Sequence, residues 1–192
     1  DKLIEIAKRE GISYFRGSLD NVSSRFYNAA KEFNLDYVVR ITGDDILRDE
    51  KMIDKAVESH LHKSYDVTFT KNMPYGTSSE VFSFKVLEAI INTVNVPSNT
   101  EYLEYYLEND RYFSVNYVDS GYQFNKNLRL TLDYEEDFKF FNLIFKNFYS
   151  SNPNFTIDDV LSWVIDNEKL MSINSNKKIK FGKQDLDVSL KI

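Results

Sequence analysis

Two aspartates stand where apolar segments of the chain end. Asp44 follows the run at residues 37–41, and Asp133 follows the run at residues 128–132. Both runs are short and rich in aliphatic residues, which predicts strands. Carboxylates at the strand ends of an α/β sheet are a common way to hold a divalent metal against a phosphorylated ligand. We therefore predict that the two carboxylates meet at one sheet edge and share a metal ion.

Local patterns along the chain alternate between helix and strand. Apolar residues at helical spacing predict helices near residues 3–8, 22–33, 52–57, 84–91 and 138–148. Capping patterns add two more helices, starting at residues 98–101 and 156–159. Short apolar runs predict further strands at residues 12–15, 65–70, 80–83 and 113–118. This order, with several strands apolar on both faces, predicts an α/β fold in which helices cover a parallel sheet.

Composition narrows the class of protein. The chain has 192 residues, of which 42% are hydrophobic and 15% aromatic, so it can bury a sizeable core. Its net charge of −6 and the lack of a basic stripe argue against nucleic-acid binding. It has no cysteine and no apolar run long enough to span a membrane, so we expect a cytoplasmic protein. We predict one domain over residues 1–170 and a polar tail or linker over residues 171–192.

Five segments, in order, resemble the cytidylyltransferase family. They are residues 15–18 (FRGS), 25–30 (RFYNAA), 39–44 (VRITGD), 80–84 (EVFSF) and 128–133 (LRLTLD). The family includes CMP-sugar-acid synthetases and the spore-coat polysaccharide biosynthesis cytidylyltransferases, and the sequence is more similar to the latter. The resemblance extends from Asp1 to about Trp163. It implies a three-layer, Rossmann-like fold of the nucleotide-diphospho-sugar-transferase type, with a mostly parallel sheet and helices on both faces.

The resemblance also implies an activity. A hydroxyl of a sugar or sugar acid attacks the α-phosphate of CTP, and pyrophosphate leaves, in a reaction that serves surface polysaccharide biosynthesis. By resemblance, Asp44 and Asp133 bind Mg²⁺, and Gly43 with Asp44 contacts the nucleotide. Arg16 and Arg25 are then the catalytic arginines near nucleotide and sugar. A homodimer is one possible assembly.

One family segment has no counterpart here. Family members begin with a strand and a glycine- and arginine-containing loop that holds the triphosphate, and this sequence matches the part that follows. We therefore expect the 192-residue chain to leave a sheet edge unsatisfied and to bind CTP poorly by itself.

Each candidate residue also has a structural interpretation. Asp44 could bond backbone amides in a turn, and Asp133, with Glu136 three residues later, could cap a helix. Arg16 and Arg25 could be surface ion-pair partners. We interpret Arg40 and Arg129, which lie inside strands, as structural partners of buried carboxylates. The histidines at 60 and 62 are expected to be solvated, and the phenylalanines from 138 to 148 to be core.

Departures from the family pattern concern the substrate. Asp45 and Ile46 follow Asp44 where the family has a small residue and proline, which adds a third carboxylate near the metal. Tyr75 and Ser78 replace carboxylates of the central loop, so we expect sugar recognition to differ. Two other classes remain open: a glycosyltransferase that uses a sugar nucleotide, and a non-catalytic binding or scaffold domain.

Overall fold

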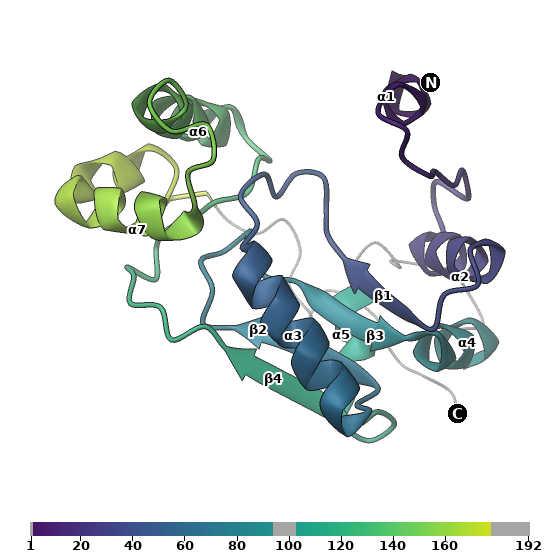
Figure 1. Ribbon diagram of the computed structural model, residues 1–192. Helices are drawn as coiled ribbons and strands as arrows, with labels where there is room; N and C mark the ends of the chain where they lie inside the picture. Colours follow the sequence, from purple (N-terminus) through teal and green to yellow (C-terminus); the bar gives the residue numbers. More distant parts are fainter. Residues whose placement is uncertain (1, 94–102, 178–192) are drawn as a thin grey trace.

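A mixed sheet of four strands forms the centre of the fold (Figure 1). Our computed structural model describes residues 2–93 and 103–177. The spatial order is β1-β3-β2-β4, with β2 parallel to β4 and β3 antiparallel to both of its neighbours. β1, β2 and β4 therefore share one direction, and the predicted α/β class is confirmed. The described sheet is mixed and not parallel as the sequence predicted, because β3 enters it antiparallel. The strands are β1 (Tyr37–Arg40), β2 (Val67–Lys71), β3 (Glu80–Ser83) and β4 (Val115–Asp119).

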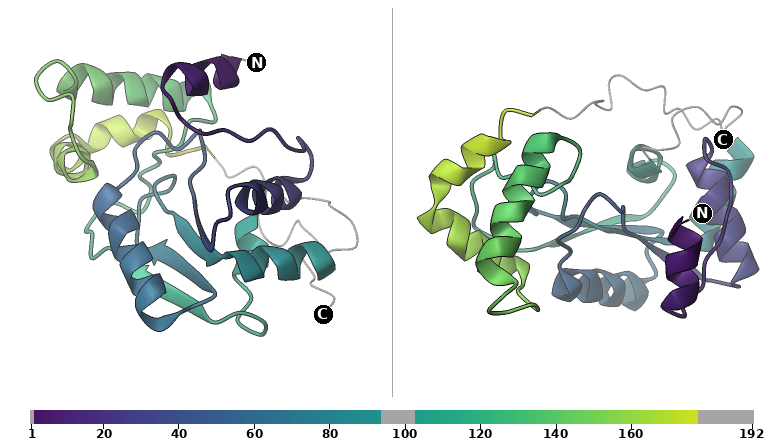
Figure 2. Two further views of the ribbon diagram at one scale, coloured as in Figure 1. Left: turned by 45° about the vertical axis from the view of Figure 1, so that its right-hand side comes forward. Right: turned by 90° about the horizontal axis from the view of Figure 1, so that it is seen from above.

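Helices cover both faces of this sheet, as the view from above in Figure 2 shows. One face carries α3 (Glu50–Lys63), which contacts β2, β3 and β4. The other side carries α2 (Val22–Glu32), α4 (Phe84–Thr93) and α5 (Leu103–Leu107). None of the helices within the described ranges is long and apolar enough to cross a bilayer.

Alternation along the strands decides which residues meet which helices. Val67 and Phe82 are fully buried on the side of α4 and α5. Thr68, the next residue of β2, faces the opposite side and contacts α3. Because successive strand residues point to opposite faces, both faces of the central strands are covered. The first core cluster consists of Ala30, Val67, Phe82, Val86, Leu87, Ile90, Leu103, Tyr106, Leu107 and Phe113.

A second apolar cluster lies beyond the sheet and is built from three helical elements. These are α6 (Glu135–Phe148), α7 (Ile157–Asp166) and the 3₁₀ helix η2 (Glu168–Ile173). The predicted cap of α7 is confirmed, because the Asp159 carboxylate accepts from the Thr156 backbone N–H at 2.7 Å. In α6, Phe141 is buried as predicted, whereas Phe138 is 57% exposed and Phe140 takes a core position instead.

Two predicted strands are absent from the described structure. Residues 12–15 are extended but pair with no described strand, and Ile12 remains 61% exposed. Residues 128–132 run through the structure with a single parallel bridge, from Arg129 to Tyr75. Their apolar side chains Leu128 and Leu130 are buried in the second cluster and not in the sheet. An apolar run indicates that its residues will be buried, but it does not show that they will form a β-ladder. Here they are buried against helices instead.

β1 lies at one edge of the described sheet and hydrogen-bonds only to β3. Tyr37 and Val39 are accordingly 43% and 37% exposed. The N-terminal helix α1 (Lys2–Arg9) buries none of its residues and stands away from the sheet in Figure 1. The sequence-based expectation of a strand buried on both faces is therefore wrong for β1. Tyr37 and Val39 point to the face on which α3 packs against β2, β3 and β4, and they remain partly exposed there.

The described part of the predicted tail packs against the domain. Met171 and Asn174 are buried, and the Asn174 side-chain amide donates to the Arg129 carbonyl at 3.1 Å. Residues 178–192, and the capping pattern at residues 98–101, lie outside the described ranges.

His60 departs from its predicted position in solvent. Its side chain is buried between α3 and the sheet, with Nδ1 3.0 Å from the Thr68 hydroxyl and its ring edge-on to Tyr37. Burial lowers the pKa of His60, and the nearby Asp66 carboxylate only partly opposes this. His62, two residues later, is exposed as expected. The core therefore holds a neutral imidazole.

This burial predicts a loss of stability in mild acid. The unfolded chain binds a proton at His60 near the ordinary pKa of about 6.5, whereas the folded chain resists it, so stability falls as pH drops below that value. His60→Gln should flatten the dependence of the urea midpoint on pH between pH 7.5 and about 5.5, and His62→Gln should leave it unchanged. Identical slopes for His60→Gln and the unmodified protein would contradict the neutral, buried state.

Candidate active site

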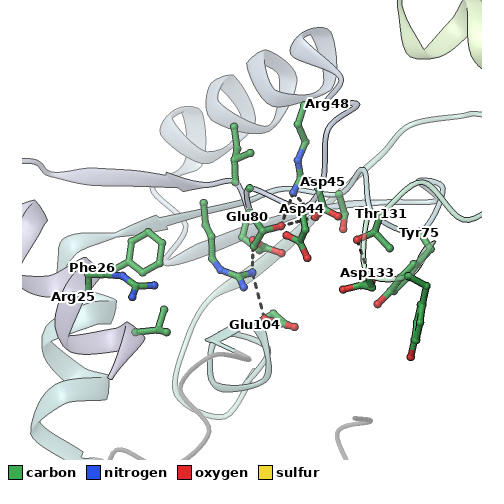
Figure 3. Close-up of a pocket in the computed structure, with 18 residues that line it drawn as sticks. Arg25, Phe26, Asp44, Asp45, Arg48, Tyr75, Glu80, Glu104, Thr131 and Asp133 are labelled. Carbon is green, nitrogen blue, oxygen red and sulfur yellow. Dashed lines mark hydrogen bonds and ion pairs between the residues drawn. The ribbon is translucent and has the colours of Figure 1, made fainter. Parts of the chain in front are cut away.

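A cleft of about 460 Å³ opens at the carboxyl end of β1 (Figure 3). One wall comes from α2, β1 and α5, and the other from the segment that precedes α6. This is the edge at which open α/β sheets bind ligands. The lining residues are Val22, Arg25, Phe26, Arg40, Ile41, Thr42, Gly43, Asp44, Asp45, Arg48, Tyr75, Gly76, Ser78, Glu80, Glu104, Thr131, Asp133 and Tyr134.

The cleft brings Asp44 and Asp133 together, as the sequence predicted. The backbone N–H of Leu132 donates to the carbonyl of Asp44 at 2.9 Å, so the two aspartates lie on touching segments. Both line the cleft. Their convergence arises from this contact between loops and not from two adjacent strands of the sheet.

The Asp44 carboxylate is bare. Asp44 is exposed, and its side chain forms no hydrogen bond or ion pair with the part of the chain that the structure describes. The turn interpretation, in which this carboxylate bonds backbone amides, is therefore wrong for the described residues. A cleft carboxylate that no hydrogen bond or ion pair holds, and that Arg48 attracts only at longer range, is available to a cation.

Asp133 is held in place by its neighbours. Its Oδ2 accepts a short hydrogen bond from Arg129 and lies 3.4 Å from the Thr131 hydroxyl. It does not cap α6, because that role belongs to Asp137, whose carboxylate accepts from the backbone N–H groups of Asp133 and Tyr134. The side chain of Asp133 remains 29% exposed, toward the cleft.

Arg129 connects these groups. Its Nε donates to Asp137 at 2.9 Å, and its guanidinium lies 5.1 Å and 5.4 Å from the ring centres of Tyr75 and Tyr134. Burial works to raise the pKa of Asp137, but hydrogen bonds from Arg129, Asn174 and the backbone outweigh it and lower that pKa. The structural interpretation of Arg129 is thus confirmed, and the residue also positions Asp133.

Gly76 allows the two walls to approach each other. Its φ of +90° is in a region that favours glycine, and a Cβ there would lie 2.5 Å from the carbonyl oxygen of Leu130. The backbone N–H of Leu130 meanwhile donates to the Tyr75 carbonyl at 2.7 Å. The loop that carries Tyr75 and Ser78 is therefore fixed against the segment that carries Asp133.

Arg40 forms a buried ion-pair chain across the floor of the cleft. Its guanidinium lies 3.2 Å from Glu80 and 3.3 Å from Glu104. Burial raises the pKa of Glu80, and Arg40 partly opposes that rise. The predicted carboxylate partners of Arg40 are confirmed, but sequence reasoning missed that all three side chains line the cleft. Glu80 stands opposite Arg40 only because β3 pairs antiparallel with β1, a register the sequence did not show.

Asp45 and Arg48 form a second ion pair at the cleft. The Asp45 carboxylate accepts from the Thr42 hydroxyl and from Arg48. Burial raises the pKa of Asp45, against the effect of Thr42 and Arg48. The sequence placed Asp45 near the metal but missed Arg48, because both lie in the loop before α3, where a spacing of three residues does not by itself predict contact.

The two predicted catalytic arginines lie in different places, and of the two Arg25 lines the cleft. Arg25 lines the cleft from α2 and donates from Nη1 to the carbonyl of Ser18 at 3.0 Å. Arg16 is exposed in the segment before α2 and is absent from the cleft lining. Gly43 lies in the cleft with open space where a Cβ would stand, so a ligand can approach its backbone.

The cleft carries an excess of negative charge. Five of its lining residues are acidic and three are arginines, and two of these arginines are already ion-paired to carboxylates. A polyphosphate would therefore meet net repulsion unless a cation accompanied it. No group of three or more His, Cys, Asp or Glu side chains suited to a metal occurs in residues 2–93 and 103–177.

Comparisons with known proteins agree with this geometry. A protein-family model described as "Cytidylyltransferase" matches residues 3–150. The uncharacterized protein MJ1063 of Methanocaldococcus jannaschii is 36% identical over 180 residues, which cover 93% of this chain and 73% of that protein. The spore coat polysaccharide biosynthesis protein SpsF of Bacillus subtilis is 26% identical over 134 residues, which cover 68% of this chain and 56% of SpsF.

A solved structure gives the same result. The cytidylyltransferase of Leptospira borgpetersenii superposes with a TM-score of 0.81 at 29% identity, covering 94% of this chain and 76% of that one. The chain belongs to the cytidylyltransferase family, a family of transferases. The three-layer fold of the nucleotide-sugar-transferase type expected from the sequence is confirmed by this match.

The buried network around Arg129 predicts a large effect on stability. Asp137→Ala leaves the Arg129 charge without its buried partner and two backbone amides without an acceptor, so unfolding free energy should fall by about 3–5 kcal/mol. Asp159→Ala, which removes only a partly exposed cap, should cost about 1 kcal/mol. Urea unfolding measures both. Equal losses for the two variants would show that the Arg129 network does not stabilise the fold as described.

Proposed function

We propose that this protein is a Mg²⁺-dependent cytidylyltransferase that transfers CMP from CTP to a hydroxyl of a sugar or sugar acid. The observation that carries the proposal is the bare Asp44 carboxylate facing Asp133 across a cleft of the cytidylyltransferase fold. In the proposed reaction the acceptor oxygen bonds to the α-phosphorus of CTP, the bond to the β-phosphate oxygen breaks, and pyrophosphate leaves. The hydroxyl proton passes to solvent.

The residues present fit a magnesium ion. Asp44 and Asp133 offer hard carboxylate oxygens from two separate segments, and Mg²⁺ typically takes one or two carboxylates together with phosphate oxygens and waters. The absence of a larger ligand cluster in the described residues agrees with this small protein contribution. The acidic excess of the cleft supports the same conclusion. When bound, the ion would neutralise charge on the phosphate oxygens.

The chain's own side chains supply orientation. Arg25 presents a guanidinium from the α2 wall, and its fork of donors suits phosphate or carboxylate oxygens. Arg129 fixes the Asp133 carboxylate, so this ligand is pre-organised before substrate binds. Gly43 leaves its backbone open to the nucleotide.

The biological role is proposed from the relatives. SpsF, a spore coat polysaccharide biosynthesis protein, matches over 68% of the chain, which supports a role in making surface polysaccharide. Because CTP is a cytoplasmic metabolite, a cytoplasmic location accompanies this proposal. A homodimer and the catalytic role of Arg16 likewise remain predictions.

The central test removes one carboxylate charge. Asp44→Asn should lower the rate of pyrophosphate release from CTP by about 100-fold or more while leaving the melting temperature nearly unchanged, since the exposed side chain packs against nothing. Asp54→Asn, on the exposed side of α3, is the matched control and should keep full activity. An active Asp44→Asn enzyme at limiting Mg²⁺ would refute the proposed site.

The two arginines can be compared directly. Arg25→Met should reduce kcat/KM by about 10- to 100-fold, because a cleft donor to an oxyanion is lost. Arg16→Met tests the prediction from the sequence, and its position outside the cleft lining leads us to expect a smaller loss. Steady-state kinetics with CTP as varied substrate measures both, and a greater loss for Arg16→Met would reverse the assignment.

A further inference from the structure

Two neighbouring aspartates of the cleft are in opposite states. Asp44 is exposed and has no hydrogen-bond partner in the described chain, whereas the Asp45 carboxylate is held by Arg48 and by side-chain hydrogen bonds with Thr42 and Thr131. Oδ2 of Asp45 accepts from the Thr42 hydroxyl and from Nη2 of Arg48, each at 2.5 Å. The side chains of Asp45 and Arg48 are only 15% and 11% exposed. Figure 3 shows Arg48 reaching from the start of α3 toward these two aspartates.

Besides its bonds to Asp45 and Thr42, Arg48 is attracted through space by the carboxylates of Glu80 and Asp44. Its backbone lies beside Asp49, the N-cap of α3, which is held by the Met52 backbone N–H and the Tyr122 hydroxyl. Its Nε and Nη1 atoms are buried and have no hydrogen-bond partner among the described residues. A buried guanidinium with unused donors costs stability. The bonds of Arg48 to Asp45 and Thr42 leave two of its buried nitrogen atoms without partners, so stability alone does not explain this residue. We therefore expect its role to lie in the cleft.

A free Asp45 would change the cation chemistry of the cleft. With Asp44 and Asp133 it would form a site of three carboxylates, which favours cations that accept more protein oxygens, such as Ca²⁺, and binds them without a nucleotide. It would also occupy space that phosphate oxygens need. Mg²⁺, by contrast, works best here with two carboxylates and open positions for substrate.

We propose that Arg48 is a positioning residue that withholds Asp45 from the metal, so that the cleft keeps a site of two carboxylates that needs the nucleotide for tight cation binding. The inference rests on the proposed function, because it assumes a metal at Asp44 and Asp133. Asp133 is also paired with an arginine, Arg129, but its side chain stays 29% exposed toward the cleft, whereas that of Asp45 is 15% exposed and also accepts from Thr42.

The test measures metal binding without turnover. Mn²⁺, a spectroscopic substitute for Mg²⁺, is titrated into the intact protein without nucleotide, and free Mn²⁺ is followed by electron paramagnetic resonance. Arg48→Met should bind Mn²⁺ about tenfold or more tightly than the unmodified protein, because a cation is removed and a carboxylate released. No gain in affinity would overturn the proposal.

A charge-balanced control keeps the test decisive if Arg48→Met unfolds. The double variant Asp45→Asn with Arg48→Met removes both charges, so its Mn²⁺ dissociation constant should stay within about twofold of the unmodified value. A tenfold loss in the double variant would show that Asp45 is itself a ligand. A loss of CTP affinity with unchanged Mn²⁺ affinity would assign Arg48 to the phosphates. Either result would overturn the proposal.

Asp44→Asn separates this inference from the function on which it rests. If Asp44→Asn binds Mn²⁺ as well as the unmodified protein, the proposed metal site fails. If Asp44→Asn loses binding while Arg48→Met gains none, only the role of Arg48 fails.

Discussion

The buried guanidinium of Arg129 holds together the wall of the cleft that carries Asp133. Within the described part of the chain, the segment at residues 128–134 forms one isolated bridge, from Arg129 to Tyr75, and no sheet ladder. Arg129 replaces that ladder, binding Asp133 in the cleft and Asp137 at the first turn of α6. Arg129 bonds to both carboxylates, so the interaction that anchors the start of α6 also fixes the position of the candidate metal ligand Asp133.

The cleft follows from two separately packed apolar clusters. α2, α4, α5 and the sheet share the first, and α6, α7 and η2 share the second. Polar residues meet where these clusters face each other, since neither cluster covers that surface. Among the described residues, hydrogen bonds between the two sides include Leu132 to Asp44 and Leu130 to Tyr75, together with a side-chain hydrogen bond between Thr131 and Asp45. The Arg129 guanidinium also lies over the Tyr75 ring. The cleft therefore lies where it does because the apolar residues pack into two separate clusters, with polar residues left between them.

Sequence reasoning predicted the main helices and the α/β class because hydrophobic spacing is a local signal. It also placed Asp44 and Asp133 together, but on the ground that both follow sheet strands, whereas residues 128–132 lie outside the sheet. It could not predict that Glu80 faces Arg40, since this depends on β3 entering the sheet antiparallel. It placed His60 in solvent because polar neighbours masked a position on the buried side of α3. Sequence reasoning predicted a sheet strand at residues 128–132, because an apolar run does not show whether its residues will pack in the sheet or in the second apolar cluster.

Gly76 limits how this site can diversify. Any side chain there would collide with the Leu130 carbonyl, so this position is closed to variation that keeps the two walls in contact. Tyr75 and Ser78 are exposed at the cleft and do not meet this backbone restriction, although the Tyr75 ring lies against Arg129. Changes of acceptor preference are therefore easier at the exposed Ser78 than at Gly76, because a side chain at position 78 can alter the cleft surface without separating the two walls.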